Sequence, residues 1–297
     1  MAEILTFTIK KFAMQKSAFI LILLVFLCSC KWEEPTKDLE AIETKKAPVR
    51  KQPKNISFHF ENTKQWLAKT TDSTQLRIAL AVNRTDKANI AKMDSIIIPG
   101  DLTGDVEFYL PFPLEVPYLK DIDKIIFFSY PTQSFATYEN GQLIYTGPTN
   151  MGRKKDPTPT GLFYTNWKAE KTTSTFNDEW DLRWNFNIAN KAGVGWHQYE
   201  LPGYPASHSC LRLQEKDARY LYDWADQWIM QDDETVLVKG TPVIVFGSYD
   251  FDGPKPWLQL VQNPKALDIS VAEIENTVTP HLNNILSEQE KRGKNGL

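Results

Sequence analysis

The distribution of apolar and polar residues divides the chain into three parts. Residues 18–27 form a run of ten apolar residues, which is too short to span a bilayer. Three lysines precede this run, and a basic start followed by an apolar run is typical of a secretory signal. Residues 31–55 are polar, mixed in charge and contain three prolines, which predicts a flexible tether. Folded structure is therefore expected from residue 56 onward.

The first folded part, residues 56–118, has a mixed pattern. Residues 75–84 (QLRIALAVNR) carry apolar side chains at helical spacing, and residues 94–102 (DSIIIPGDL) predict a strand that runs into a turn at Pro99. We expect a small α/β segment here. A helix with an asparagine near its end, followed by a strand that closes on IIIP, is similar to a LysM glycan-binding module. The alternative is a supporting subdomain that binds no ligand.

Strand patterns dominate from residue 119 to residue 250. Residues 124–130 are a continuous apolar run, and residues 133–147 predict a hairpin across Asn140-Gly141, because this dipeptide favours the tight turns of hairpins. Two late strands are expected within residues 234–247.

One clear amphipathic helix interrupts the strands, at residues 215–229, and Glu215 and Asp217 lie in its first turn, where carboxylates favour the helix dipole. The C-terminal extension, residues 251–297, is expected to end in a helix at 270–291. The overall pattern predicts an α+β fold that is mainly β.

Composition narrows the range of partners. The chain has 297 residues, of which 42% are hydrophobic, so it can bury a substantial core. The formal net charge is −3 and no basic stripe is present. Nucleic acid is therefore not expected as a partner.

The cysteines have different predicted fates. The apolar run ends in LCSC, with Leu27 three positions before Cys30. This motif resembles the lipobox of bacterial lipoproteins, which implies that residues 1–30 contain the signal peptide and that Cys30 is the lipidated residue. The protein would then be a lipid-anchored membrane protein of the cell envelope that faces the periplasm. An ordinary signal peptide cleaved nearby is the alternative. If Cys28 is removed with the signal peptide and Cys30 is acylated, Cys210 remains as the sole thiol of an exported chain, without an intramolecular disulfide partner.

Cys210 lies in the heptapeptide SHSCLRL, residues 207–213, and is either a nucleophile or a buried apolar side chain. A thiol nucleophile needs a base or electropositive surroundings, and the nearby histidines are His197 and His208. If residues 207–210 are extended, His208 and Cys210 lie on one face with Cβ atoms about 6–7 Å apart. Closer contact is easier from a separate strand, which favours His197.

Several motifs in this region occur in a recognisable order. They are ENGQ at 139–142, DPTPTG at 156–161, His197, SHSCLR at 207–212 and GTPVIV at 240–245. This set resembles the L,D-transpeptidase catalytic domain, also called the YkuD type, over roughly residues 120–250 of this chain. The resemblance implies a mixed β-sheet sandwich or barrel with a helix after the catalytic cysteine. It also implies acyl transfer between peptidoglycan stem peptides through a thioester, with no cofactor and no metal.

The resemblance assigns roles to individual residues. Cys210 is the expected nucleophile and His197 the base, held in one tautomer by the backbone carbonyl of Gln198. His208 is the third expected catalytic residue, on the oxyanion side of the site, and a structural hydrogen bond is the alternative role. The further expected roles are oxyanion binding by the N–H groups of Ser209 and Cys210 and substrate binding by Arg212, Ser207 and Trp196. One position departs from the family pattern, since a glycine usually stands where this chain has Ser209.

Other interpretations remain open. The same catalytic groups also support hydrolysis, as in an L,D-carboxypeptidase or a cross-link hydrolase, and a lipid-anchored wall-binding protein without activity is a non-enzymatic alternative. In papain-like thiol peptidases the cysteine precedes its histidine, which does not fit His197. A zinc site would need ligands beyond the two histidines and Cys210. Residues 166–187 are polar and aromatic, and we expect them to form a lid over the cleft.

Overall fold

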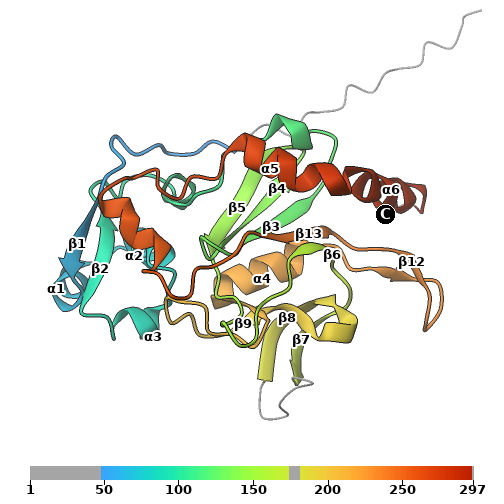
Figure 1. Ribbon diagram of the computed structural model, residues 1–297, viewed down its shortest axis with the longest axis horizontal. Helices are drawn as coiled ribbons and strands as arrows, with labels where there is room; N and C mark the ends of the chain where they lie inside the picture. The colour runs from blue at the N-terminus through green and yellow to red at the C-terminus, as the bar shows by residue number, and fades with distance from the viewer. Residues whose placement is uncertain (1–47, 174–180, 296–297) are drawn as a thin grey trace, which may run out of the picture. The chain divides into compact units, whose positions relative to one another are not determined.

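A computed structural model describes residues 48–173 and 181–295. The expected signal peptide at 1–30, Cys30 within it and most of the tether at 31–55 lie outside the described residues. The described residues form thirteen strands and six α-helices, so the predicted α+β, mainly β class is confirmed (Figure 1). None of the helices in these ranges is both long and apolar enough to cross a bilayer.

The larger sheet has five strands in the order β5-β4-β3-β13-β6. Its strands are β3 (Ile125–Ser129), β4 (Ser134–Glu139), β5 (Gln142–Pro148), β6 (Gly161–Tyr164) and β13 (Pro242–Phe246). β13 is parallel to β3 and antiparallel to β6. The pairing of β3 with β13 thus brings the first and last strands of the predicted strand region side by side.

The predicted hairpin is present between β4 and β5. Asn140 and Gly141 both have positive φ angles, of 46° and 81°, as two-residue hairpin turns of the type I′ class require. A Cβ on Gly141 would lie 2.6 Å from the carbonyl oxygen of Val116. This turn therefore needs glycine both for its conformation and for the close approach of a neighbouring loop.

The smaller sheet has four strands in the order β10-β9-β8-β7. They are β7 (Lys168–Thr173), β8 (Asp181–Ala189), β9 (Val194–Gln198) and β10 (Leu211–Leu213). The described part of segment 166–187, for which a lid was expected, contains paired strands. β7 and β8 pair with each other, and β8 also pairs with β9. The role of this segment as a lid over the cleft stays a prediction. Residues 174–180 lie outside the described ranges.

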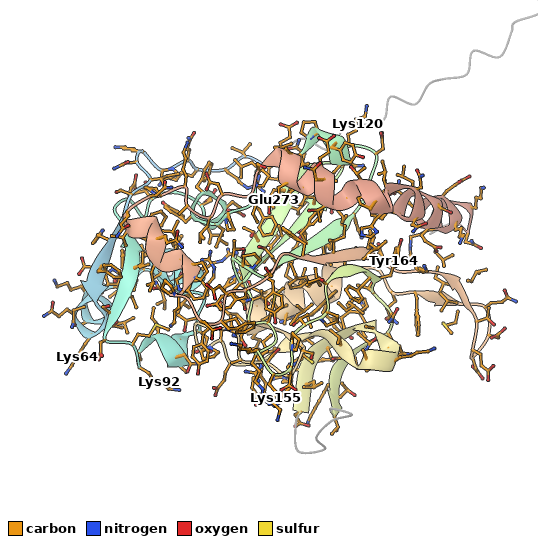
Figure 2. The ribbon with its side chains drawn as sticks, in the orientation of Figure 1. Lys64, Lys92, Lys120, Lys155, Tyr164 and Glu273 are labelled. Atoms are coloured by element: carbon orange, nitrogen blue, oxygen red, sulfur yellow. The ribbon has the colours of Figure 1, made fainter. Side chains whose placement is uncertain are left out.

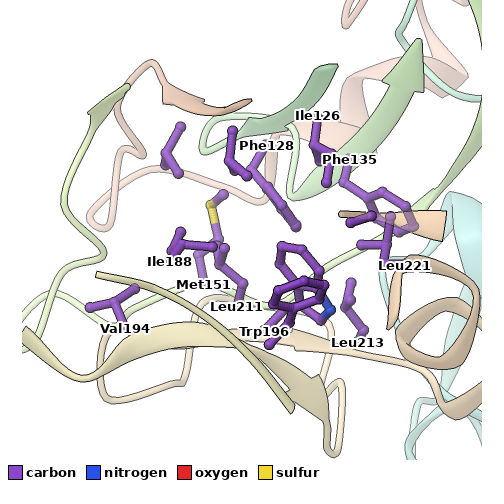
Figure 3. Close-up of a cluster of buried hydrophobic side chains, with 14 of the residues drawn as sticks. Ile126, Phe128, Phe135, Met151, Ile188, Val194, Trp196, Leu211, Leu213 and Leu221 are labelled. Atoms are coloured by element: carbon purple, nitrogen blue, oxygen red, sulfur yellow. The ribbon is translucent and has the colours of Figure 1, made fainter. Parts of the chain in front are cut away.

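The hydrophobic core lies on both faces of the five-stranded sheet, because neighbouring residues of a strand point to opposite faces. Ile126 and Phe128 of β3 pack with residues of β8, β9 and β10 and of helix α4 (Glu215–Trp224). Figure 3 shows this cluster, with side chains converging from both sheets. Ile125 and Phe127 pack on the other face, where helices α5 (Val271–Val278) and α6 (Leu282–Lys294) cover the sheet.

The helix predicted at 215–229 ends earlier than expected. α4 stops at Trp224, and β11 (Ile229–Met230) pairs with β12 (Val236–Val238) where the helix was predicted to continue. The backbone of Asp226 explains the early end. Its N–H donates to Thr241 Oγ1 and its carbonyl accepts from the N–H of Thr241. These tertiary hydrogen bonds outweigh local helix propensity.

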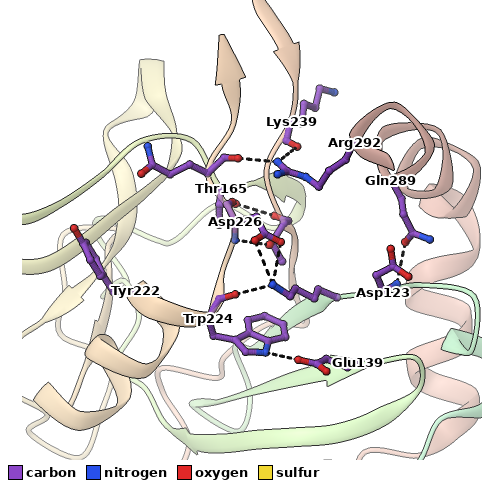
Figure 4. Close-up of polar contacts among 12 residues, drawn as sticks. Asp123, Glu139, Thr165, Tyr222, Trp224, Asp226, Lys239, Gln289 and Arg292 are labelled. Carbon is purple, nitrogen blue, oxygen red and sulfur yellow. Dashed lines mark hydrogen bonds and ion pairs between the residues drawn. The ribbon is translucent and has the colours of Figure 1, made fainter. Parts of the chain in front are cut away.

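The predicted C-terminal helix is divided into α5 and α6 by a short 3₁₀ turn at Thr279–His281, which contains Pro280. Figure 4 shows how α6 is attached to the rest of the fold. Arg292 donates hydrogen bonds to the carbonyls of Gln227 and Lys239, and Gln289 accepts one from the N–H of Asp123.

The N-terminal segment forms a separate small sheet. β1 (Phe58–Asn62) is antiparallel to β2 (Ser95–Pro99), and the helices α1 (Thr63–Lys69), α2 (Ser73–Val82) and α3 (Lys87–Ile90) lie between them in sequence. Figure 2 shows the side chains of this segment at one end of the fold, with Lys64 and Lys92 on its surface. Its α/β character agrees with the sequence, whereas its boundaries and its LysM-like role stay predictions.

Candidate active site

The pairing of β9 with β10 determines the geometry around the thiol. These neighbouring strands are parallel, with Arg212 opposite His197 and Leu211 opposite Trp196. Continued by one residue, this register places Cys210 beside Gly195. Ordinary strand spacings then give a Cα separation of about 8 Å between His197 and Cys210.

The alternation of side chains sorts these residues onto two faces. Trp196 and Leu211 are fully buried in the core, while His197 and Arg212 occupy the opposite face of the strand pair. Trp196 packs against Phe128 and Phe186, with ring centroids 6.4 and 4.8 Å away. The expectation that Trp196 binds substrate is therefore wrong, because its side chain has no exposed surface (Figure 3).

His197 is held in a single orientation. Its Nδ1 lies 2.9 Å from the carbonyl oxygen of Gln198. A carbonyl only accepts hydrogen bonds, so Nδ1 carries the proton and Nε2 is the basic nitrogen. Only 4% of the residue is exposed, and burial lowers the pKa of His197 to about 4, with the nearby Arg212 cation acting in the same direction. His197 is thus a neutral imidazole at neutral pH.

Cys210 is half-buried, and its Sγ lies 4.0 Å from the carbonyl oxygen of Gly193. Burial raises the pKa of the thiol, although the backbone N–H of Gly195 and the charge of Arg212 both oppose this rise. Cys210 and His197 are therefore both neutral at neutral pH. A neutral imidazole assists a neutral thiol by accepting its proton during attack rather than through a preformed thiolate–imidazolium pair.

The chain bends immediately before Cys210. Ser209 has a φ angle of +78°, in the left-handed region that favours glycine. The assumption that residues 207–210 are extended is therefore wrong, and His208 and Cys210 do not share a strand face. The bend also gives a physical reason why a glycine suits this position.

Two hydroxyl groups hold the bend. Ser207 Oγ donates to the carbonyl of Cys210 at 2.5 Å, and Thr158 Oγ1 donates to the carbonyl of Ser209 at 2.9 Å. Ser207 is only 1% exposed, so the expectation that it binds substrate is wrong and its hydroxyl instead supports the backbone. Thr158 belongs to the DPTPTG motif, which acquires a structural role here.

The loop at 149–158 was not identified as part of the site from the sequence. It runs beside the cysteine segment, with Asn150 bridged to Arg212 and Gly152 bridged to Ser207. The proline- and threonine-rich composition of this loop predicts a turn, but no local pattern indicates which segment it contacts.

His208 lies in a different electrostatic environment from His197. The charges that act on it are those of Arg153, Asp156, Arg212 and Lys155. Burial and the Arg153 cation lower the pKa of His208, while Asp156 opposes this change. His208 therefore belongs to the side of the site formed by the 149–158 loop, where Figure 2 labels Lys155.

Arg212 and Tyr199 form a cationic surface next to the base. The guanidinium carbon of Arg212 lies 4.3 Å from the Tyr199 ring centroid, and this ring meets the His197 ring edge-on at 5.8 Å. Within the described ranges, no carboxylate forms an ion pair with Arg212. Tyr199 was missed in the sequence, although its position two residues after His197 would have placed it on the same strand face.

The backbone near the thiol offers further donors. No described residue accepts a hydrogen bond from the N–H of Ser209 or from that of Cys210. A helix was predicted from residue 215, after the cysteine, and α4 does begin at Glu215, behind the short strand β10. The two N–H groups therefore lie at the bend before β10 and not at the start of a helix. The described ranges contain no group of three or more His, Cys, Asp or Glu side chains suited to hold a metal.

Residues 123–245, which contain both His197 and Cys210, match the family model of the YkuD L,D-transpeptidase catalytic domain. These residues are thus similar to the catalytic domain of L,D-transpeptidases. The match covers less than half of the chain, and the N-terminal segment lies outside it.

Solved structures give a more limited similarity. An L,D-transpeptidase from Mycobacterium smegmatis is 20% identical with a TM-score of 0.34, and the similarity covers 42% of this chain and 59% of that one. An L,D-transpeptidase from Stackebrandtia nassauensis is 22% identical with a TM-score of 0.35, covering 43% and 57%. This chain thus spans less than two thirds of the length of these structures. No curated protein sequence matches it.

The neutral states of His197 and Cys210 predict how the ionisation of the thiol depends on pH. Because the pKa of Cys210 is raised, thiolate absorbance near 240 nm, taken as wild type minus Cys210→Ser, should be absent at neutral pH and grow only above about pH 8.5. Protonation of His197 should remove the base only near pH 4. A thiolate signal that is already complete at about pH 6 would instead show a preformed ion pair.

The bend at Ser209 makes a second prediction. Ser209→Gly should keep the site intact and leave the free energy of unfolding in urea unchanged or raised by up to about 1 kcal/mol. Relief of the left-handed strain should offset both the greater freedom of glycine in the unfolded chain and the loss of the 3.3 Å hydrogen bond from Ser209 Oγ to the carbonyl of Asp156. Ser207→Ala is the contrasting variant. It should lower that free energy by about 1–3 kcal/mol, because the buried carbonyl of Cys210 loses its donor. A clear loss of stability in Ser209→Gly would contradict this account of the bend.

Proposed function

We propose that this protein is a cysteine-dependent L,D-transpeptidase that acts on peptidoglycan stem peptides in the cell envelope. The observation that carries the proposal is the placement of Cys210 next to the strand of a neutral, tautomer-fixed His197, within a domain that matches the L,D-transpeptidase family model. The cation of Arg212 on the same strand face supports it further.

The first half of the reaction forms a thioester. The Cys210 sulfur attacks the carbonyl carbon of the L-centred residue of a donor tetrapeptide, while His197 Nε2 accepts the thiol proton. The N–H groups of Ser209 and Cys210 are positioned to stabilise the negative oxygen of the tetrahedral intermediate. The C–N bond to the terminal D-residue then breaks, and His197 returns the proton to the leaving amine.

The second half transfers the acyl group. The side-chain amine of a diamino acid on a neighbouring stem attacks the thioester carbonyl, and His197 accepts the proton that this amine releases. The C–S bond breaks, and the sulfur regains a proton from His197. Hydrolysis follows the same course with water in place of the amine, so the two reactions differ in the acceptor and not in the catalytic groups.

Two neighbouring features suit the charged ends of stem peptides. Arg212, half-buried and stacked on Tyr199, is suited to bind a donor carboxylate. A groove of about 870 Å³ adjoins the end of β9 and is lined by Gln198, Tyr199 and the first turns of α4. Side chains of both charges line it, among them Glu200, Glu215, Lys216 and Arg219, so it is suited to contact both the amine and the carboxylate of a stem peptide.

Membrane attachment is part of the proposal. The LCSC motif supports acylation of Cys30, and the polar residues 31–55 would tether the catalytic domain to the membrane on its periplasmic side. Mass spectrometry of the protein purified from membranes tests this step. A diacylglycerol adduct on an N-terminal Cys30 is expected, whereas an unmodified N-terminus created elsewhere would indicate an ordinary signal peptide.

The activity itself is tested with the chain from residue 31 onward and a disaccharide-tetrapeptide substrate. We expect dimers linked between two diamino-acid residues, detected by mass spectrometry, and a covalent adduct of a carbapenem on Cys210. Loss of the terminal D-residue without dimers would favour the hydrolase, and absence of both reaction and adduct would favour the inactive wall-binding protein.

Matched variants test the assigned roles. Cys210→Ala should abolish transfer and hydrolysis together. His197→Ala should reduce the acylation rate by about 10²–10⁴-fold, because it removes the general base. His208→Ala should have a smaller effect, because the bend separates it from the strand face of Cys210. A larger effect of His208→Ala than of His197→Ala would reverse the assignment of the base.

A further inference from the structure

The connection between the two catalytic strands needs external support. β9 and β10 are parallel neighbours, and parallel strands cannot be joined by a tight hairpin. Residues 199–210 make this connection and contain no helix or strand. Ordering a long irregular segment costs conformational entropy, and this segment ends at Cys210. Whatever holds it also determines where the thiol lies relative to His197.

The turn between α2 and α3 supplies such contacts from outside the family match. Thr85 Oγ1 donates to the carbonyl of Leu201 at 2.9 Å, and Thr85 also bridges to Pro202. Asp86 Oδ2 accepts from the N–H of Leu201 at 2.6 Å, and the N–H of Asp86 donates to the carbonyl of Leu201 at 3.3 Å. Both polar groups of the Leu201 backbone are therefore bound by the N-terminal segment.

The same stretch contacts two other parts of the catalytic domain. Gln214, which follows β10, donates from Nε2 to the carbonyl of Thr85 at 2.8 Å. Arg84 donates from Nε to the carbonyl of Thr132, in the turn before β4, at 2.6 Å. Arg84 and Thr85 are 1% and 0% exposed. These are buried contacts, so their hydrogen bonds are shielded from water and costly to lose.

Asp86 is fixed in place by its own helix. Its Oδ1 accepts from the N–H groups of Ala88 and Asn89 at the start of α3, and its Oδ2 accepts from Asn89 Nδ2. An aspartate that caps a helix is common, but this one also reaches across to the 199–210 connection. Asp72 provides a comparison, because it caps α2 in the same way, through Thr74 and Gln75, without such a contact.

We propose that Thr85 and Asp86 are positioning residues of the active site, through which the N-terminal segment holds the 199–210 connection so that Cys210 meets His197. The N-terminal segment is then an obligatory part of the catalytic unit. This inference rests on the proposed roles of Cys210 and His197 but not on the identity of the peptidoglycan substrate.

Alkylation of Cys210 by iodoacetamide tests the proposal without any cell-wall substrate. Asp86→Asn should slow alkylation of the full mature chain about tenfold or more at neutral pH, since misplacement of reacting groups by about 1 Å costs up to about 10²-fold. The deficit should vanish at about pH 10, where the thiol ionises without a base. Thr85→Val should show the same pH signature to a smaller degree, and Thr85→Ser should restore the wild-type rate.

The controls separate positioning from a loss of folding. Asp72→Asn makes the same substitution at a helix cap that has no contact with the 199–210 connection. Asparagine caps a helix as well as aspartate does, so this variant should alkylate at the wild-type rate. Partial unfolding would expose the thiol and speed alkylation at every pH, which is opposite to the expected result. If Asp86→Asn does not fold, Thr85→Val and Thr85→Ser decide the question.

Three results would overturn the proposal: wild-type alkylation rates in Asp86→Asn and Thr85→Val, faster alkylation in both at every pH, or an equal deficit in Asp72→Asn. His197→Ala tests the proposed function separately from this proposal. It should slow alkylation of Cys210 at neutral pH as Asp86→Asn does. If it does not, the assignment of His197 as the base is wrong.

Discussion

The parallel pairing of β9 with β10 is the constraint on which the site depends. It places Arg212 opposite His197, and it puts the thiol one step before the strand that carries this arginine. Because the two strands run in the same direction, the chain must cross over between them without a hairpin. In this protein the crossover is an irregular segment rather than a helix. This segment is therefore held by contacts from three places: the hydroxyl of Ser207, the DPTPTG loop and the N-terminal segment.

Burial sets the chemistry of the pair. Water is excluded from His197 by the surrounding sheet, so the charged imidazolium is disfavoured and the ring stays neutral as a base. The same exclusion disfavours the thiolate, even though Arg212 and the N–H of Gly195 stabilise it. These opposing effects leave the thiol protonated at neutral pH. A protonated thiol is also less prone to oxidation than a thiolate.

Local sequence patterns predicted those features of the fold that depend on local physics. The Asn140-Gly141 hairpin and the apolar strands were correct because turn chemistry and hydrophobic runs act within a few residues. The end of α4 was not, because hydrogen bonds from Thr241 capture the backbone of Asp226. The order of the motifs identified His197 and Cys210. The burial of Trp196 depends on strand register, and the hydrogen bond of the Ser207 hydroxyl depends on its tertiary partner. No local sequence pattern contains either kind of information.

Ser209 shows how a local sequence feature and its tertiary contacts act together. In the sequence it is a departure from the family motif, between a histidine and a cysteine. In the structure its positive φ angle strains the backbone. Its carbonyl accepts a hydrogen bond from Thr158 and its hydroxyl donates one to the carbonyl of Asp156, so the surrounding loop over-determines the bend. A glycine would adopt the same conformation without strain but could not make the second contact. The serine thus strains the backbone, but its side chain links the bend to the 149–158 loop. This loop also borders His208.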